Sequence, residues 1–371
     1  MKITIVIGAF FPVPPIIGGA VEKIWFALSR EFARRGHDVL VISRASPQLP
    51  RSEVLDGVRH VRVAGFDAPR SLVWLKFLDL VYSIRARRVL PKADIVVTNT
   101  FWLPILLRSS KYGKVCVQVG RYPKGQMRFY RHVALLQPPT QAIKRAILAE
   151  APDIESKISV IPHPGPQSHT SEPPPPIENR EKVILYVGRV HPEKGVHLLV
   201  DAFAGKPFAF PGWRLVIVGP TEIKLGGGGA AYDLDLRNRA GDAPVAFPGP
   251  IFDPALLEKQ FRSAQLFVYP SLAERGETFG IAALEGMTHG CSVIVSDLEC
   301  FQDFVRDGET GFVFEHHSTN PVESLQAVMN KVIADPVLRK NVSEAGYREA
   351  ARYSPERIAE RYLSDFAQLT N

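Results

Sequence analysis

Residues 2–43 read KITIVIGAFFPVPPIIGGAVEKIWFALSREFARRGHDVLVIS and contain a complete strand–helix–strand pattern. KITIVIG (2–8) and DVLVIS (38–43) are short apolar runs that are typical of buried strands. Between them, apolar residues recur at the spacing of one helix face, namely Val21, Ile24, Trp25, Leu28 and Phe32. Gly36 ends this helix. Two strands joined through a helix predict a parallel sheet with helices on its faces.

The same rhythm continues along the chain. In the first half it predicts further strands at 94–99, 114–119 and, as the last one, ISVIP at 158–162. It restarts with strands at 182–188, 213–219, 265–271 and 292–297, a helix at 196–203, and a helical tail from about residue 321. Between the halves lies GPQSHTSEPPPPIENRE (165–181), whose four consecutive prolines are typical of a linker.

We therefore expect an α/β protein with two Rossmann-like, doubly wound parallel-sheet domains that face a cleft. The domains are predicted at 1–164 and 182–355, with the linker at 165–181. Residues 356–371 are predicted to form a C-terminal helix that returns to the first domain. Ligands of such folds bind at the carboxyl ends of the strands.

Composition excludes several classes of protein. The 371 residues include only three cysteines, without a C-x-x-C pair, so neither a disulfide framework nor a structural zinc site is expected. Prolines at 12, 14 and 15 argue against a signal peptide, and there is no apolar run of eighteen residues that would span a membrane. We expect a cytoplasmic protein, with a possible peripheral place on the inner face of the cell membrane.

Charge is distributed unevenly. Residues 1–170 hold 25 Lys and Arg against 11 Asp and Glu, a net charge of +14. The remaining residues hold 20 against 27, a net charge of −7. The basic half predicts an anionic partner, although no aromatic–basic motif points to nucleic acid.

Three motifs carry the chemistry. The first is ETFGIAALE (277–285), which follows a strand and opens an apolar helix, so that Glu277 and Glu285 could face one ligand. The second is GRVHPEKG (188–195), where Arg189 and Lys194 are placed to bind a pyrophosphate. The third is Gly18-Gly19 after the first strand. Judged alone, each motif also has an ordinary structural explanation. The glutamates of 277–285 could be solvated surface residues, 188–195 could be a basic strand–helix turn, and Gly18-Gly19 could be a tight turn.

Together the motifs resemble the family 4 retaining glycosyltransferases of the GT-B fold. The resemblance extends over most of the chain. It includes Glu22, the RGHDV turn (35–39), Pro248-Gly249, Pro270-Ser271 and DGETGF (307–312). The ordered set is specific, although no single member is.

The resemblance implies roles for individual residues. Arg189 and Lys194 would neutralise the diphosphate leaving group, and Glu277 would bind hydroxyls of the donor sugar. These three residues would be the catalytic ones. Glu285 would bind the ribose. The other donor-binding residues would be Gly18, Gly19, Pro250, Ile251, Thr278, Phe279, Gly280 and Ile281. No cofactor and no metal is expected, since the positive groups are provided by the protein.

The acceptor side departs from the family pattern. A common histidine after the strand at 94–98 is replaced by Asn99, and the loop after 114–119 also lacks one. His163, in place of the family's asparagine, is expected to be structural. The acceptor residues are predicted to be Asn99, Arg121, Lys124 and Arg128.

The predicted activity is retaining, metal-independent transfer of a hexose from a nucleotide-diphosphate sugar to a glycan or lipid-linked acceptor in surface polysaccharide synthesis. A UDP-sugar is the expected donor and a GDP-sugar the alternative. A nucleotide-sugar epimerase and a non-catalytic nucleotide-sugar-binding protein remain open as other functions.

Three further groups of residues are of types that can contact a membrane or a metal ion. Residues 70–88 mix large apolar residues with a basic end, which suggests contact with an acidic membrane, although an ordinary core-facing helix is slightly favoured. Asp233 and Asp235 do not make a convincing metal site, and His316-His317 has no partner at ligand spacing.

Overall fold

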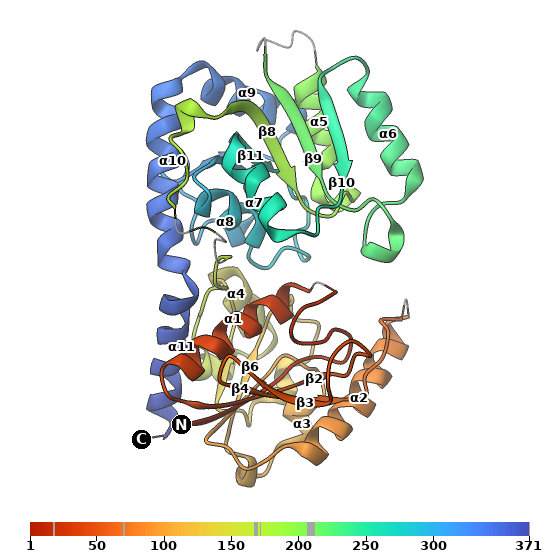
Figure 1. Cartoon of the computed structure of the whole chain (residues 1–371), viewed down its shortest axis with the longest axis vertical. Coiled ribbons are helices and arrows are strands. Elements are labelled where there is room, and N and C mark those ends of the chain that lie inside the picture. The colour runs from red at the N-terminus through yellow and green to blue at the C-terminus, as the bar shows by residue number, and fades with distance from the viewer. Residues whose placement is uncertain (18, 70, 167–169, 171, 206–211, 371) are drawn as a thin grey trace. The chain divides into compact units, whose positions relative to one another are not determined.

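The computed structural model describes the whole chain except residues 18, 70, 167–169, 171, 206–211 and 371. The chain divides into two compact units. Unit 1 is Met1–Pro164 with Pro355–Asn371, and unit 2 is Gly165–Ser354. Each unit contains one mainly or wholly parallel sheet with helices packed against it (Figure 1). The expected fold class, two doubly wound α/β domains, is confirmed.

The sheet of unit 1 has the strand order β3-β4-β2-β1-β5-β6-β7, in which only β3 is antiparallel to its neighbour. Its strands are β1 Lys2–Val6, β2 Asp38–Arg44, β3 Ser52–Leu55, β4 Val58–Val63, β5 Ile95–Thr98, β6 Lys114–Gln118 and β7 Leu135–Gln137. Its helices are α1 Ala20–Arg34, α2 Leu72–Val89, α3 Leu103–Leu106, α4 Gln141–Glu150 and α11 Pro355–Thr370. The β3–β4 hairpin and β7 are short, and the sequence pattern did not predict them.

The prediction of a last strand at 158–162 is wrong. This segment makes a single isolated bridge, between Ile158 and Leu136 of β7. Irregular bonds follow, in which the amide of Ile161 donates to the carbonyl of Pro138. Because prolines at 138 and 139 have no N–H, the ladder cannot continue beyond β7.

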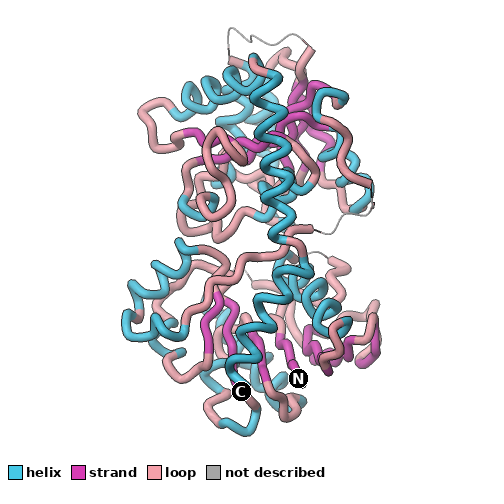
Figure 2. Tube along the Cα trace, turned by 90° about the vertical axis from the view of Figure 1, so that its left-hand side faces the viewer, coloured by secondary structure: helices cyan, strands magenta, loops and turns pink. Residues whose placement is uncertain are grey.

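Helix α11 packs against α1 inside unit 1. The rings of Trp25 and Tyr362 lie 5.3 Å apart, and those of Phe32 and Phe366 lie 6.0 Å apart. At the end of α11, the hydroxyl of Thr370 lies 3.8 Å from the sulfur of Met1. The two termini therefore lie together, as Figures 1 and 2 both show. Aromatic packing explains why the last helix of the chain belongs to the first unit.

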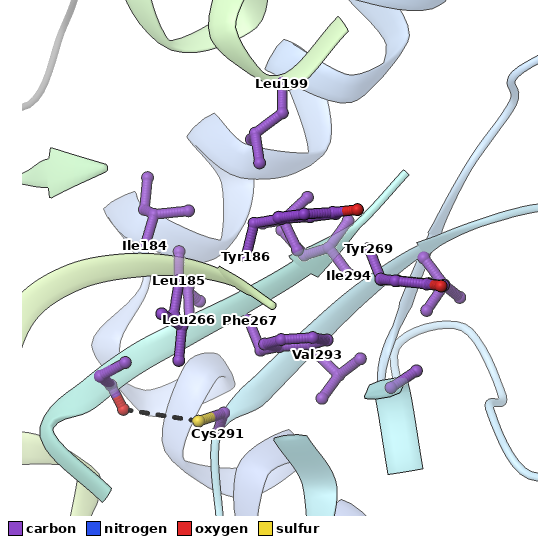
Figure 3. Packing of buried hydrophobic residues seen from close by; sticks show 14 of the residues in the cluster. Ile184, Leu185, Tyr186, Leu199, Leu266, Phe267, Tyr269, Cys291, Val293 and Ile294 are labelled. Carbon is purple, nitrogen blue, oxygen red and sulfur yellow. Dashed lines mark hydrogen bonds between the residues drawn. The ribbon is translucent and has the colours of Figure 1, made fainter. Parts of the chain in front are cut away.

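The sheet of unit 2 is parallel throughout and has the order β10-β9-β8-β11-β12-β13. Its strands are β8 Glu181–Val187, β9 Arg214–Val218, β10 Val245–Gly249, β11 Ala264–Tyr269, β12 Ser292–Ser296 and β13 Phe312–Phe314. Its helices are α5 Val196–Ala204, α6 Ala230–Ala240, α7 Pro254–Ser263, α8 Ile281–Thr288, α9 Pro321–Ala334 and α10 Pro336–Ala350. Figure 3 shows how Ile184, Leu266 and Ile294 from adjacent strands fill the core.

Helix α2 faces the core through Tyr82 and Ala86 in its second half, which agrees in part with the slightly favoured prediction of a core-facing helix. Its buried residues are few, and the first two turns expose large apolar side chains: Leu72, Val73, Trp74 and Phe77 are 58%, 78%, 59% and 51% exposed. The rings of Trp74 and Phe77 contact each other edge to face, 5.5 Å apart. Among the described residues, no helix is both long enough and apolar enough to cross a membrane.

Candidate functional site

Two stacked tyrosines lie next to a polar cluster at the carboxyl ends of β8 and β11 and bind its loops through their hydroxyl groups. The rings of Tyr186 and Tyr269 are nearly parallel, with centroids 5.9 Å apart (Figure 3). Tyr186 donates its hydroxyl hydrogen to the carbonyl of Arg189 at 2.8 Å, and Tyr269 donates to Oε2 of Glu277 at 3.0 Å. Burial raises the pKa of both phenols well above their usual value, so each stays a hydrogen-bond donor.

The tyrosines hold two loops that lie side by side. The amide of Leu272 donates to the carbonyl of Glu193 at 2.8 Å, which joins the loop after β11 to the turn after β8. Gly195 has φ +65°, and a Cβ there would lie 2.0 Å from the carbonyl oxygen of Pro270. Only glycine permits this close approach, so the final glycine of the 188–195 motif sets the distance between the loops.

The joined loops bring Lys194 and Glu277 together. Nζ of Lys194 lies 2.7 Å from Oε2 of Glu277, and the two side chains are 7% and 11% exposed. The same oxygen accepts a bond of 3.3 Å from the hydroxyl of Ser271. Lys194 also lies over the ring of Tyr269, 5.6 Å from its centroid. The carboxylate is thereby fixed, and a buried positive charge lies directly beside it.

Arg189 lies on the more open side of the turn. Its guanidinium donates to Glu193 at 2.7 Å and to the carbonyl of Gly226 at 2.9 Å. Burial alone would raise the pKa of Glu193, but the hydrogen bond and charge of Arg189 outweigh it and lower that pKa. The amide of Gly228 donates to the carbonyl of Val190. The glycine-rich segment at 226–229 therefore lies against the motif.

Gly280 opens α8 with φ +87°, and a Cβ there would meet Phe301 at 2.2 Å. Phe279 is buried against Phe304, with ring centroids 5.2 Å apart, so its side chain belongs to the core. The other predicted donor residues of this region, Thr278, Ile281 and Glu285, are half-buried. Pro250 and Ile251 are half-buried just beyond the end of β10. The structure thus brings most predicted donor residues to strand ends of one sheet.

In unit 1, Gly19 adopts φ +102° directly before α1, and a Cβ there would lie 2.1 Å from Oε2 of Glu22. Burial raises the pKa of Glu22, although the charge of Arg121 opposes this. Gly18 lies outside the described residues. The predicted contact of Gly19 with the donor stays a prediction.

A second buried carboxyl lies near Arg121 in unit 1. Burial raises the pKa of Asp79 to about 6, against the opposing effects of the amides of Trp102 and Phe101 and of the charge of Arg121. Both amides donate to Oδ2 of Asp79, at 3.2 and 3.1 Å. Sequence reasoning missed Asp79, because an aspartate within an amphipathic basic helix looks like a surface residue.

Asn99 and His163 occupy positions where the family pattern differs. Oδ1 of Asn99 is buried without a hydrogen-bond partner among the described residues. His163 is buried, and Nε2 of Gln118 lies 3.4 Å from its Nδ1, while Gln118 accepts a bond from Trp25. Burial lowers the pKa of His163 to about 4. A neutral histidine enclosed in this way is suited to a structural role. The buried oxygen of Asn99, in contrast, could accept a hydrogen bond from a ligand.

The basic run after β6 is exposed. Arg121, Lys124 and Arg128 all lie at the surface. The guanidinium of Arg128 donates to the carbonyl of Gly125 at 3.1 Å. Arg131 further along the run is instead paired with Asp153 at 2.8 Å. The predicted acceptor residues thus keep positive charge at the surface of unit 1.

The histidine pair His316-His317, for which the sequence predicted no partner at ligand spacing, has one in the structure. Nε2 of His316 and Nε2 of His317 lie 2.8 and 2.7 Å from Oε1 of Glu274. The statement that this histidine pair lacks a partner at ligand spacing is therefore wrong, because Glu274 reaches it from another strand end. Asp233 and Asp235 form ion pairs with Arg237 and Arg239, one helical turn away.

Comparison with known proteins matches both units. A family model described as Glycosyl transferases group 1 matches residues 168–349, and one described as Glycosyltransferase Family 4 matches residues 17–164. A phosphatidyl-myo-inositol mannosyltransferase of Mycobacterium leprae is 26% identical over 96% of this chain and 95% of its own. A lipopolysaccharide 1,2-N-acetylglucosaminetransferase of Salmonella typhimurium is 23% identical over 97% of each.

Solved structures are similar over the full length. A sucrose-phosphate synthase from Thermosynechococcus elongatus superimposes with a TM-score of 0.80 at 19% identity, over 100% of this chain and 99% of that one. Anabaena Alr3699/HepE in complex with UDP gives 0.71 at 19% identity, over 99% of this chain and 100% of that one. At such identity the likeness shows the shared fold.

Proposed function

Because the chain belongs to the group 1, family 4 glycosyltransferases, we propose that it transfers a hexose, with retention of configuration, from a nucleotide-diphosphate sugar to a glycan or lipid-linked acceptor. We assign the donor to unit 2 and the acceptor to unit 1. A UDP-sugar is the preferred donor, and a GDP-sugar the alternative. Relatives named for a phosphatidyl-myo-inositol and for a lipopolysaccharide product support a lipid-linked acceptor.

The pairing of Lys194 with Glu277 carries this proposal. Breaking the bond from the anomeric carbon to the diphosphate leaves the electron pair, and thus negative charge, on the phosphate oxygen. Fixed positive groups stabilise such charge best where water is excluded. Lys194 is buried and held in place, and Arg189 adds a second, more exposed cation. These two side chains would supply the charge stabilisation without a metal ion.

Glu277 would accept hydrogen bonds from hydroxyls of the donor sugar. Oε2 already accepts bonds from Lys194, Tyr269 and Ser271. A carboxylate offers about four acceptor positions, so the group still has capacity for a sugar. Because Lys194 contacts the same carboxylate, diphosphate and sugar would bind next to each other, as they are in the donor. Glu285, which lies on α8 in the same motif, would bind the ribose.

Retention would follow from attack of the acceptor hydroxyl on the face that the diphosphate leaves. The new bond joins the acceptor oxygen to the anomeric carbon, and the released phosphate oxygen takes the acceptor's proton. This route needs no protein base to take the proton of the acceptor hydroxyl, which fits a neutral, enclosed His163. Asn99, whose buried Oδ1 has no hydrogen-bond partner within the described part of the chain, would help to orient the acceptor.

An anionic, lipid-linked acceptor is favoured by the surface of unit 1. Arg121, Lys124 and Arg128 would bind its phosphate, and α2 exposes Leu72, Val73, Trp74 and Phe77. An apolar patch on a strongly basic domain is suited to an acidic membrane surface, where each basic residue contributes about 1 kcal/mol. We propose peripheral binding to such a surface, without insertion of a helix across it.

The test is incubation of the purified protein with a panel of UDP- and GDP-sugars, with and without lipid-linked and glycan acceptors. Acceptor-dependent release of the nucleotide, with an α-linked product from an α-linked donor, is the expected result. Donor binding without turnover on any acceptor would favour a nucleotide-sugar-binding protein, and acceptor-independent conversion of the sugar an epimerase. Glu285→Ala should weaken nucleotide binding about 10-fold or more, as expected for loss of a charged hydrogen bond.

A further inference from the structure

Three adjacent strands of unit 2 bring four chemically related side chains to one edge of the sheet. Glu274 follows β11, Asp297 follows β12, and His316 and His317 follow β13. These strands are neighbours in the parallel sheet. Parallel strands end at the same edge, which explains how residues 42 positions apart in sequence come into contact. We propose that Glu274, His316 and His317 bind a divalent cation of the zinc class.

The geometry supports three ligands. One ligand atom from each residue lies within 4.8 Å of the others. Oε1 of Glu274 is 2.8 Å from Nε2 of His316 and 2.7 Å from Nε2 of His317. A tetrahedral zinc ion with bonds of about 2.0–2.1 Å would hold its ligand atoms about 3.3 Å apart. Each histidine nitrogen would therefore need to move away from Oε1 of Glu274 by only about half an ångström.

The hydrogen-bond partners of His316 argue that something other than a neutral imidazole is required. Nδ1 of His316 contacts Oδ1 of Asp297, while its Nε2 contacts Glu274. Both carboxylates only accept hydrogen bonds, whereas a neutral imidazole carries a single N–H. One of the two contacts must therefore be made through an additional proton or through a metal ion.

A metal ion would connect all three side chains. The rings of His316 and His317 lie 3.9 Å apart, and Oε1 of Glu274 is in contact with Nε2 of both rings, so one ion could contact all three ligand atoms. With an ion on Nε2, both rings stay neutral, and Nδ1–H of His316 donates to Asp297. A histidine that donates to a carboxylate while binding metal through its other nitrogen is a recurrent arrangement in zinc sites. Asp297 also accepts a bond from the backbone amide of His316 at 2.8 Å.

The three proposed ligands differ in how deeply their side chains are buried. The side chain of His316 is 4% exposed, whereas Glu274 and His317 are 54% and 70% exposed. The ion would thus have one rigid ligand, two ligands at the surface, and a position open to water. It would tie the loop after β13 to the loop after β11, which also carries Glu277. None of its ligands belongs to the proposed donor site, so transfer itself would still need no metal.

The experiment uses the full chain without a polyhistidine tag, stripped of metal by a chelator and titrated with Co²⁺ and then Zn²⁺. We expect one equivalent of Co²⁺ with the intense visible absorption of a low-coordinate site, displaced by one equivalent of Zn²⁺. His317→Ala and Glu274→Gln should each raise the Kd at least about tenfold. Asp297→Asn should keep the stoichiometry and raise the Kd about 10- to 100-fold, as expected of a positioning residue. Glu323→Gln, the same change at an exposed site on α9, is the matched control.

No stoichiometric uptake of metal by the wild type, or unchanged Kd values in both His317→Ala and Glu274→Gln, would overturn the zinc proposal. Nitrogen NMR that shows both nitrogens of His316 protonated in the presence of Zn²⁺ would establish the imidazolium instead. Because Glu274 and His317 are more than half exposed, both variants should fold, and unchanged melting temperatures without metal verify this.

Discussion

Lys194 and Glu277 lie 83 positions apart in sequence, yet Nζ of the first is 2.7 Å from Oε2 of the second in an almost fully buried ion pair. Each comes from a loop at the carboxyl end of a strand, and the strands β8 and β11 are neighbours in the sheet. Such a pair is costly to bury and adds little to stability compared with apolar residues. Its presence is better explained by a ligand that needs both charges.

The pair allows structure and catalysis to be separated. Lys194→Met leaves a buried carboxylate without its partner and should destabilise unit 2 by about 3–5 kcal/mol. Adding Glu277→Gln removes that charge, and the double variant should recover most of the loss. Turnover should stay lost in the double variant, because neither diphosphate nor sugar is bound correctly. Urea unfolding and nucleotide release measure the two effects, and full recovery of turnover would contradict the assigned roles.

Arg189 should matter more for turnover than for binding. Charge on the leaving group grows in the transition state, so Arg189→Ala is expected to lower kcat about 10²- to 10³-fold and to weaken donor binding about tenfold or less. Arg214→Ala is the control. Arg214 is an exposed arginine at the amino end of β9, whereas the site lies at the carboxyl ends of the strands, and it pairs with Glu181. Calorimetric titration and initial rates provide the comparison. Equal losses in binding and turnover would mean that Arg189 only holds the ground state.

Gly280→Ala should damage unit 2 through a steric clash. The positive φ alone costs about 1–2 kcal/mol for alanine, and the new Cβ would lie 2.2 Å from Phe301. We expect a loss of about 2–4 kcal/mol in the free energy of unfolding. Gly308→Ala is the matched control: it has φ +71° but no atom within 4 Å of the added Cβ, so only the backbone cost of about 1–2 kcal/mol applies. Similar losses in both variants would show that Phe301 moves away.

His163 should influence stability at acid pH more than activity. Its pKa in the fold is about 4, below the ordinary 6.5. The unfolded chain therefore binds a proton more readily, and stability present above pH 6.5 is lost as the pH falls through 4. The loss is on the order of 3 kcal/mol.

His163→Asn, which keeps an acceptor for Gln118, should remove this part of the pH dependence and leave turnover at neutral pH close to wild type. Tryptophan fluorescence follows mainly unit 1, which holds Trp25, Trp74 and Trp102, whereas unit 2 holds Trp213. A large loss of turnover in His163→Asn would show that the histidine is catalytic.

Exposed apolar residues of α2 should be required for binding to acidic vesicles. Trp74→Ser with Phe77→Ser is expected to reduce co-sedimentation at low salt, and high salt should weaken binding of the wild type as well. Phe252→Ser, at a 76% exposed phenylalanine of unit 2, is the control. Equal sedimentation with neutral and acidic vesicles would contradict the membrane proposal. Normal transfer by Arg121→Ala and Arg128→Ala would contradict the acceptor proposal.

The sequence was sufficient for the fold class and for most strands and helices of the two units. Buried parallel strands are continuous apolar runs and their helices are amphipathic, so both are visible locally, as in residues 2–43. It failed where the signal is short or irregular, as at β7 and at 158–162, where prolines and not hydrophobicity decide the pairing. The exposed face of α2 was also misjudged, because apolar residues in a helix do not reveal whether anything covers them.

The sequence also singled out Arg189, Lys194, Glu277 and Glu285 as candidate site residues, through an ordered set of motifs that resembles the family, and their roles stay predictions. Only the tertiary structure decided that Lys194 and Glu277 contact each other, and that Tyr186 and Tyr269 support them. The same holds for Glu274 with His316, and for the buried state of Asp79. Local spacing encodes strands, helices and turns, whereas the order of strands in a sheet determines which loop ends meet, and that order is set by packing between segments far apart in the chain.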